Sequence, residues 1–425
     1  MRRVLVLLCL LVALAACSKE EEKAQPKGEG APTVEGQAPA PEVVAPGVDW
    51  LAKDFSSAVE AARETTVRLA LPAAEQAAAR WVDEWLAPEA KRRYGITVER
   101  VTREPADVAA GVLAGEGRAA ADLDLVWCFG REFHVLRDGG ALFGPFAGKL
   151  PNFQAYVNKD LASQDFGLAN GGFESPWGWE QFVFEYDSAR VKNPPASYSA
   201  LLEWVRAHPG RFTYPRPSDP VGSAFLRQAL FAASGGYQQY MTPFKQDFAR
   251  DRFSLLWSYL DVMTPHLWKK GREYPKDAAE LSALFARGEV DMAMSFEPLH
   301  AQHNVLAGTY KDTVRTMVME DGSLYHLRFV AIPKDAPNKP GAMVLADLIL
   351  APEAQLAKFQ PKAWGDFPAV DVSRLPASFQ TKIVGTHLGK ASLSFGALGV
   401  SAVPEIPAEY GAALDKGWAA RFGDK

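Results

Sequence analysis

Residues 123–140 read LDLVWCFGREFHVLRDGG, and an apolar strand pattern in this stretch runs directly into a helical one. Residues 123–129 are almost entirely apolar, as in a strand that is buried on both faces of a sheet. Residues 132–137 have the spacing of a short helix, which Gly139 and Gly140 end because glycine readily adopts the backbone conformations that close a helix. A buried strand followed at once by a helix is the building unit of an α/β fold.

The same unit precedes this stretch. Residues 65–71 and 96–101 have strand patterns, and residues 74–93 between them have an amphipathic helical pattern with tryptophans on one face. A further helix is predicted over residues 107–114. Strand–helix–strand units of this length predict parallel strands joined by right-handed crossovers.

A second series of elements begins after Pro176. Strands are expected at 182–186, 211–214 and 290–295, and helices at 198–207, 223–233 and 279–287. A strand at 327–332 and a helix at 341–350 then resemble a return to the first series. This order predicts two α/β lobes, with residues 48–178 in the first lobe, 179–322 in the second, and 323–425 completing the first.

The N-terminus has the pattern of an export signal. Arg2 and Arg3 precede an apolar run at 4–14 that is too short to span a bilayer, and small residues then lead to Cys17. This pattern resembles a bacterial lipobox, in which the cysteine is acylated and becomes the mature N-terminus. The alternative is an ordinary signal peptide with a chance cysteine. We therefore expect a lipoprotein signal peptide at 1–17, a lipid anchor on Cys17, and a place in the cell envelope facing the periplasm or the exterior.

The next segment, residues 18–47, is rich in Glu, Lys, Pro, Gly, Ala and Gln and has no apolar periodicity. Such a segment cannot offset the entropy cost of ordering by burying apolar surface. We expect a disordered tether between the anchor and the folded body.

Composition and missing motifs exclude several classes of function. The 425-residue chain has a formal net charge of −5, which argues against binding to nucleic acid. Cys128 is the only cysteine after Cys17, so the folded body can form no internal disulfide. The sequence contains no GxSxG, GxxxxGK[ST], GxGxxG, HExxH or CxxC motif, and we expect neither an enzyme nor a cofactor.

Glu297, His300 and His303 are spaced by three residues and could in principle place metal ligands on one side of a helix. Each step of three residues, however, drifts by about 60° around the helix axis. We expect a hydrogen-bonded helix start here and no metal site.

Candidate binding residues lie at or just after the carboxyl ends of the predicted strands, where open parallel sheets bind their ligands, and at the expected crossing between the lobes near Trp177. Aromatic rings combined with carboxylates suit a cation or a flat heteroaromatic ring. The helix expected to begin near Ser223 offers free N–H groups to a phosphate or a carboxylate. The candidates are Trp127, Phe129, Glu132, Trp177, Trp179, Tyr214, Ser223, Ser295, Phe296 and Glu297. Each of these side chains also suits plain packing or solvent exposure.

Eight short motifs follow one another in a specific order: DLVW (124–127), GGALFGPF (139–146), PWGW (176–179), FEYDS (184–188), FTYP (212–215), GSAF (222–225), GEVDM (288–292) and AIPKDAP (331–337). In this order the chain resembles the extracellular solute-binding component of an ABC transporter, most closely the YnjB-like family. That family is similar to the wider group of thiamine-, polyamine- and iron-binding periplasmic proteins. The resemblance covers residues 63–368 and implies the type II fold of periplasmic binding proteins, with a ligand cleft between two hinged lobes.

One loop departs from the family pattern. Relatives tend to carry an aromatic–Gly–Gly–acidic loop after the first strand, whereas this chain has LPAAE at 71–75. Only Glu75 keeps a similar character, so the resemblance adds Glu75 to the candidate ligand-binding residues.

The resemblance implies a function in solute import. A monomeric, lipid-anchored protein would capture a small solute, cationic or heteroaromatic, by closing its lobes and would deliver it to a permease driven by an ATPase. Thiamine-like molecules are the first expected class of solute and polyamines the second. An alternative is an envelope sensor or adaptor lipoprotein, whose cleft regulates a partner protein.

Overall fold

The computed structural model of the chain describes residues 47–114 and 122–423. The predicted signal peptide, Cys17 and the tether up to residue 46 lie outside these residues. Among the described residues, no helix has both the length and the apolar composition that crossing a bilayer requires.

The main sheet has the strand predicted at 123–129 in its middle. Within the described ranges, seven strands form it: β1 (Thr66–Leu71), β2 (Thr97–Thr102), β3 (Leu125–Trp127), β4 (Leu142–Phe143), β7 (Glu174–Gln181), β11 (Ser323–Pro333) and β12 (Ala402–Pro404). As predicted, β1 pairs in parallel with β2 and β3. The return strand β11 pairs in parallel with β12 but antiparallel with β3 and β7, so the parallel prediction holds for the N-terminal units and not for the pairing of β11 with β3.

Helices cover this sheet and complete the first lobe. They are α1 (Phe55–Ala61), α2 (Gln76–Trp81), the π-helical η1 (Val82–Leu86), α3 (Ala87–Tyr94), α4 (Pro105–Leu113), α5 (Arg131–Asp138), η2 (Ala147–Lys149), α6 (Pro151–Tyr156), α7 (Lys159–Ala162), α13 (Lys339–Ile349), α14 (Pro352–Phe359), η6 (Val372–Arg374), α15 (Ala377–Val384) and α16 (Phe395–Ser401). The predicted helix at 74–93 is thus one continuous run of α2, η1 and α3. Helix α13 is buried from Pro340 to Ile349 and forms the centre of the first core. Strands β5 (Gln164–Asp165) and β6 (Leu168–Ala169) form a small antiparallel hairpin.

The second lobe has its own antiparallel sheet and its own core. Strand β8 (Val183–Asp187) pairs with β9 (Met292–Ser295) and β10 (Val314–Met317). The surrounding helices are α8 (Tyr198–Ala207), α9 (Pro220–Ser234), η3 (Gln238–Tyr240), α10 (Gln246–Met263), η4 (Thr264–His266), η5 (Trp268–Gly271), α11 (Ala278–Arg287), α12 (His300–Leu306) and α17 (Ala408–Phe422). The strand predicted at 211–214 is wrong, because this buried segment makes isolated backbone hydrogen bonds, such as those to Trp268 and Asp291, and no ladder.

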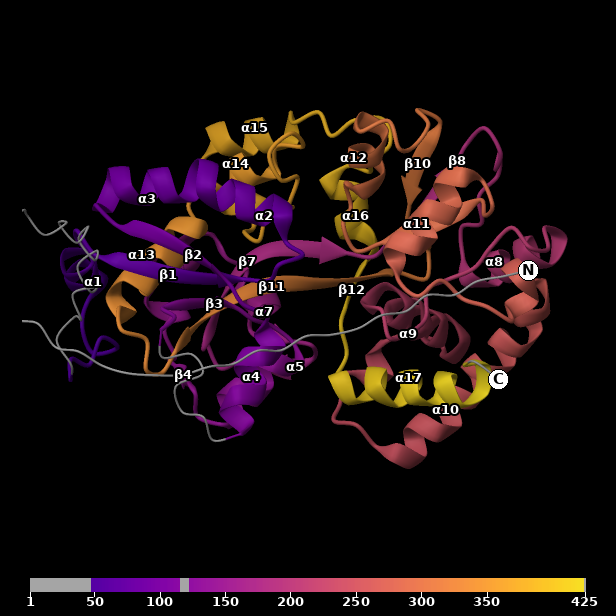
Figure 1. Cartoon of the computed structure of the whole chain (residues 1–425), viewed down its shortest axis with the longest axis horizontal. Helices are drawn as coiled ribbons and strands as arrows, with labels where there is room; N and C mark the ends of the chain where they lie inside the picture. Colours follow the sequence, from indigo (N-terminus) through magenta and orange to yellow (C-terminus); the bar gives the residue numbers. More distant parts are fainter. Residues whose placement is uncertain (1–46, 115–121, 424–425) are drawn as a thin grey trace, which may run out of the picture. The chain divides into compact units, whose positions relative to one another are not determined.

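The chain crosses between the lobes from β7 to β8, from β10 to β11, and from β12 to α17. In Figure 1, β7 and β11 run side by side between the two groups of helices, and their antiparallel register confirms the pairing. The third crossing corrects the prediction that residues 323–425 all complete the first lobe. Helix α17 packs on α9, and its Tyr410, Leu414 and Trp418 belong to the second core, because that core offers the apolar surface that α17 must cover.

Candidate functional site

Five buried or half-buried charged and histidine side chains form the floor of the site: Glu180, His326, Arg328, Lys358 and Asp366, hereafter the charged floor. Strand alternation places His326 and Arg328 on one face of β11, and the register places Glu180 of β7 directly opposite His326. His326 Nε2 lies 2.6 Å from Glu180 Oε2, and Arg328 also bonds Glu180. Arg328 Nη1 donates to Asp366 at 2.8 Å, and Lys358 Nζ lies 2.5 Å from the other oxygen of Asp366.

Charge pairing controls the protonation of this floor. Burial disfavours ionisation of Glu180, but Arg328 and His326 outweigh it and lower the pKa of Glu180 to about 2. Burial lowers the pKa of Lys358 to about 8, although Asp366 attracts the charged form. Because Arg328 and Lys358 are matched by Glu180 and Asp366, the ion pairs of the floor neutralise one another.

Two further carboxyl groups approach this floor from different lobes. Glu75 precedes α2 in the first lobe, and Glu297 follows β9 in the second. Burial raises the pKa of Glu75 to about 7; Arg328 acts against this rise, while Glu180, Glu297 and Asp366 add to it. Glu297 is exposed, and its backbone N–H donates to Ser295 Oγ at 2.9 Å, which holds the turn after β9. The site therefore carries two acidic groups beyond its balanced floor.

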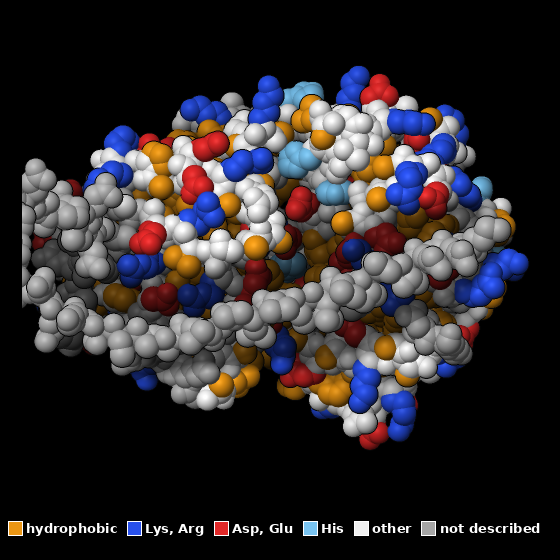
Figure 2. All heavy atoms as spheres, in the orientation of Figure 1, with side chains coloured by type: hydrophobic (Ala, Val, Ile, Leu, Met, Phe, Trp, Pro, Cys, Tyr) orange, Lys and Arg blue, Asp and Glu red, His pale blue; other side chains and the backbone are white. Residues whose placement is uncertain are grey.

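Aromatic rings surround the imidazole of His326. Phe129 stacks on it with ring centroids 5.3 Å apart, and Phe166 lies at 5.5 Å. Phe296 of the second lobe meets it edge-on at 5.1 Å. We call Phe129, Phe166 and Phe296 the aromatic wall. Figure 2 shows acidic and histidine side chains beside hydrophobic ones in the recessed region between the elements of the two lobes.

The tryptophan candidates have different places. Trp177 is fully buried, and Trp127 is buried beside it at a ring distance of 5.2 Å, so both pack in the first core beneath the charged floor. The Arg328 guanidinium lies 5.5 Å from the Trp127 ring, which links this core to the floor. Trp179 lies on β7, as Trp177 does, and it is half-buried. Its ring stacks on that of Tyr325, with the ring centroids 4.3 Å apart.

Two candidates are held by the C-terminal helix. The Ser223 hydroxyl donates to Asp415 of α17 at 2.8 Å, and Trp418 of the same helix donates to the Tyr214 hydroxyl at 2.9 Å. Tyr214 is fully buried in the second core. The structure therefore does not bring Ser223 or Tyr214 to the charged floor, and the expected helix N-terminus at Ser223 lies inside α9, which begins at Pro220.

Glu132 lies half-buried in the first turn of α5, near Asp165. The carboxylate of Asp165 accepts the N–H of Gly130 and so holds the loop that follows Phe129. Burial raises the pKa of Asp165 to about 7, and Glu132 adds to this rise. Glu132 is thus close to Asp165, the residue that precedes Phe166 in the chain.

Sequence reasoning missed Phe166 and the whole charged floor. A signal was available, because His326 and Arg328 interrupt an otherwise apolar stretch at alternate positions. Charged groups are rarely buried unless they are paired, so their presence in a central strand indicated a buried network.

The three possible metal ligands have separate surroundings. His300 Nδ1 lies 2.7 Å from Glu185, His303 Nε2 lies 3.0 Å from the Pro361 carbonyl, and Glu297 is outside α12. Among the residues that the structure describes, no cluster of three or more His, Cys, Asp or Glu side chains suits a metal ion.

Two other features contrast with the site. A cavity of about 1340 Å³ lies between α12, α14 and the segment after α15, and no predicted site residue lines it.

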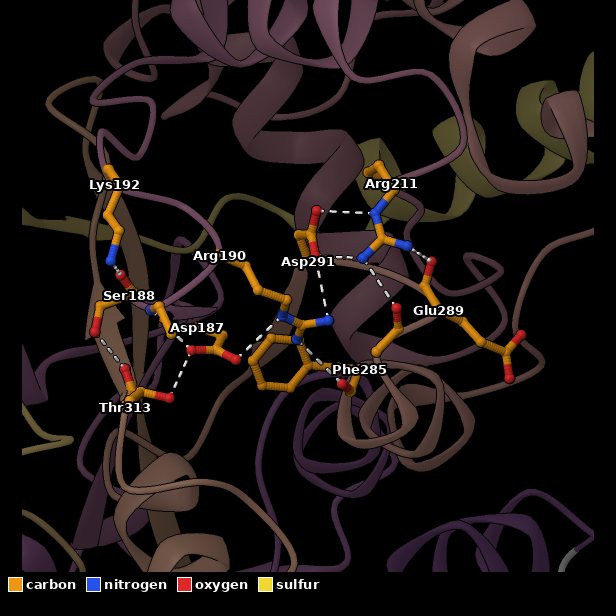
Figure 3. Close-up of polar contacts among 11 residues, drawn as sticks. Asp187, Ser188, Arg190, Lys192, Arg211, Phe285, Glu289, Asp291 and Thr313 are labelled. Carbon is orange, nitrogen blue, oxygen red and sulfur yellow. Dashed lines mark hydrogen bonds and ion pairs between the residues drawn. The ribbon is translucent and has the colours of Figure 1, made fainter.

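In the second lobe, Arg190 pairs with Asp187 and Asp291, and Arg211 pairs with Asp291 (Figure 3). The two guanidinium groups match the two carboxylates of this cluster, so it has no surplus charge to offer a solute.

The structure thus has two lobes joined by crossing strands, with acidic and aromatic side chains from both lobes around a charged floor, which is an arrangement suited to binding a solute between the lobes. The sequence agrees, since residues 85–384 match the model of the bacterial extracellular solute-binding protein family. The chain belongs to this family. It is 34% identical over 333 residues to protein YnjB of Escherichia coli strain K12, across 76% of this chain and 84% of that protein.

Solved structures show the same fold. The spermidine/putrescine ABC transporter substrate-binding protein PotD of Streptococcus pneumoniae superposes with a TM-score of 0.61 and 15% identity, covering 84% of this chain and 98% of that chain. A periplasmic thiamin binding protein superposes with a TM-score of 0.52 and 16% identity, over 85% and 96% of the two chains. By family, the chain is therefore a bacterial extracellular solute-binding protein, and its fold is that of these solved substrate-binding proteins.

Proposed function

We propose that this protein captures a small organic cation, with or without a heteroaromatic ring, by closing its two lobes over the charged floor. The observation that carries the proposal is the placement of Glu75 and Glu297, which come from different lobes, lie beyond the neutralised ion pairs and are close enough for Glu297 to add to the raised pKa of Glu75. A cation between them would replace repulsion by two attractions. Because these carboxylates belong to different lobes, this gain is larger when the lobes are closed, which is what shifts an open–closed equilibrium.

The aromatic wall supports the same class of solute. Phe129 and Phe296 come from different lobes and both contact His326. Aromatic faces attract cations and stack on flat rings, by about 0.5–2 kcal/mol for each contact. Thiamine-like solutes use both properties, and polyamines use the first. An anionic group bound at Ser223 is not part of this proposal, because Asp415 already accepts from that hydroxyl.

The proposed cycle ends at the membrane. A lipid on Cys17 and the tether at 18–47 would hold a monomeric receptor in the cell envelope, close to the permease and ATPase that receive its solute. The family assignment supports the role in transport. Replacement of Cys17 by Ser should release the protein into the soluble fraction, and an unchanged membrane fraction would argue for another means of attachment.

Differential scanning fluorimetry of the full-length protein with thiamine, spermidine and putrescine tests the choice of solute. A true ligand at about 100 times its Kd should raise the Tm by about 4 °C. Glucose and citrate serve as the neutral and anionic controls. No shift with any of the cations, or a larger shift with citrate, would overturn the proposal.

Site variants then locate the binding. Glu75→Gln and Glu297→Gln should each raise the Kd of the cation found in that panel, with about a tenfold increase for the more buried Glu75. Glu84→Gln is the matched control, because Glu84 is an exposed acid on η1 of the same lobe. Equal effects of all three substitutions would indicate a general charge effect and would remove the assignment of Glu75 and Glu297.

A further inference from the structure

Helix α12 belongs to the second lobe. It follows β9 in the chain, and His300 at its start bonds Glu185 of β8 through Nδ1 at 2.7 Å. Asn304, one turn later, donates to the His300 carbonyl at 3.0 Å. Any movement of the second lobe therefore carries α12 and the preceding residues with it.

Two residues of this segment nevertheless contact the first lobe. Leu299 is 1% exposed and packs in the core of the first lobe, while the neighbouring Ala301 packs in the second core. His303 Nε2 lies 3.0 Å from the carbonyl oxygen of Pro361, in the loop after α14. Both contacts must break if the lobes separate.

A glycine in the first lobe makes room for both side chains. Gly365 has a φ of +79°, and a Cβ at this position would lie 2.8 Å from Leu299 Cδ1 and 3.0 Å from the His303 ring. The Gly365 N–H donates to the Lys358 carbonyl oxygen at 2.8 Å. The N–H of Asp366, a residue of the charged floor, donates to the same carbonyl oxygen at 3.1 Å. The socket that receives Leu299 and His303 is therefore continuous with the binding site.

We propose that Leu299 and His303 are positioning residues that latch the closed form by docking into the socket at Gly365. The inference rests on the proposed function in that it assumes closure of the lobes. Glu297 lies two residues before Leu299, so a single short segment carries both a solute contact and the latch. A solute that draws Glu297 towards the charged floor also moves Leu299 into the socket at Gly365. When the lobes open, the apolar side chain of Leu299 is exposed to water, which is unfavourable.

Hydrogen exchange of the full-length protein, measured by mass spectrometry without any solute, tests the latch. In Leu299→Ala, amides at 361–366 and 297–303 should exchange about tenfold faster or more. Shortening a buried leucine is expected to destabilise the closed form by more than the free energy that corresponds to a tenfold change in the opening equilibrium constant. Amides of β8, β9 and β10 should keep their rates. Leu306→Ala is the matched control, since Leu306 lies on the same helix and is 62% exposed.

Two further variants separate the latch from a loss of folding. His303→Gln retains a side-chain donor for the Pro361 carbonyl and should exchange more slowly at 361–366 than His303→Ala. Gly365→Ala places a methyl group in the socket, and its effect should be smaller when Leu299→Ala is also present, as a double-mutant cycle would show.

Unchanged exchange at 361–366 in Leu299→Ala would overturn the latch, and so would a uniform increase throughout the second lobe. Because no solute is present, either result leaves the solute panel above unaffected. Conversely, a panel without any binding cation would overturn the proposed solute while the exchange data still report on the latch.

Discussion

Arg227 of α9 and Glu405, which directly follows β12, form a two-point ion pair, with Nε to Oε2 at 2.9 Å and Nη2 to Oε1 at 2.7 Å. Both side chains are almost fully buried. Arg227 also donates to Ser223, which in turn bonds Asp415 of α17. The pair thus joins the third crossing between the lobes to the interior of the second lobe.

Removal of one partner of this pair should be costly, because a buried charge is left without its counterpart. Glu405→Gln is expected to lower the free energy of unfolding by about 3–5 kcal/mol, as measured by urea denaturation. The exposed pair of Arg421 and Asp261 is the control, and Asp261→Asn should cost no more than about 1 kcal/mol. Equal costs for the two substitutions would contradict the structural role of Glu405.

Cation binding should strengthen as the pH rises through about 7. Burial raises the pKa of Glu75 to about 7, and a bound cation favours its ionised form. At pH 6 roughly one tenth of Glu75 is ionised, so the Kd measured by calorimetry should be several-fold higher than at pH 8. In Glu75→Gln this part of the pH dependence should disappear. A wild-type Kd that is independent of pH between 6 and 8 would show that Glu75 does not face the solute.

The second lobe should lose stability on the alkaline side. Burial disfavours the charged form of His300, but Glu185 outweighs it and raises the pKa of His300 to about 9. In the unfolded chain, the pKa of a histidine is about 6.5. The pair therefore contributes its full stability below about pH 6.5, and this contribution is lost as the pH rises through about 9. The urea midpoint should fall over this interval in the wild type and change less in Glu185→Gln, which leaves His300 without its charge partner.

Trp177 and Phe129 should give opposite results. Trp177 is fully buried among three other tryptophans, so Trp177→Ala is expected to cost about 3–5 kcal/mol of unfolding free energy. Phe129 is half-buried in the aromatic wall, so Phe129→Ala should mainly weaken cation binding, by roughly tenfold. Urea denaturation and calorimetry on both variants check this. Normal stability in Trp177→Ala would show that the first core is not where the structure places it.

Local patterns in the sequence were sufficient for most of the elements near the site. Residues 123–140 predicted β3 and α5, which form at Leu125–Trp127 and Arg131–Asp138. The same reasoning placed Glu297 after a strand, where the structure has it, whereas Phe129 was expected on a strand that the structure ends at Trp127. Such predictions succeed because hydrophobic periodicity and glycine ends act over a few residues.

The charged floor depended on contacts that no local pattern describes. His326 and Glu180 are 146 residues apart in the chain, and only the antiparallel register of β7 and β11 places them together. Ser223 and Asp415 are 192 residues apart, so the covering of Ser223 by α17 could not be read from the helix start alone.

The sequence by itself determined the class of fold and the family, and it supplied the acidic and aromatic candidates for a site, since these follow from the composition and order of short segments. The tertiary structure alone decided which of those side chains meet. Trp177 and Tyr214 pack in the two cores, and Glu75 and Glu297 approach one floor from different lobes. The physical reason is that burial and charge pairing depend on strand register and on lobe crossings, which join residues far apart in the chain.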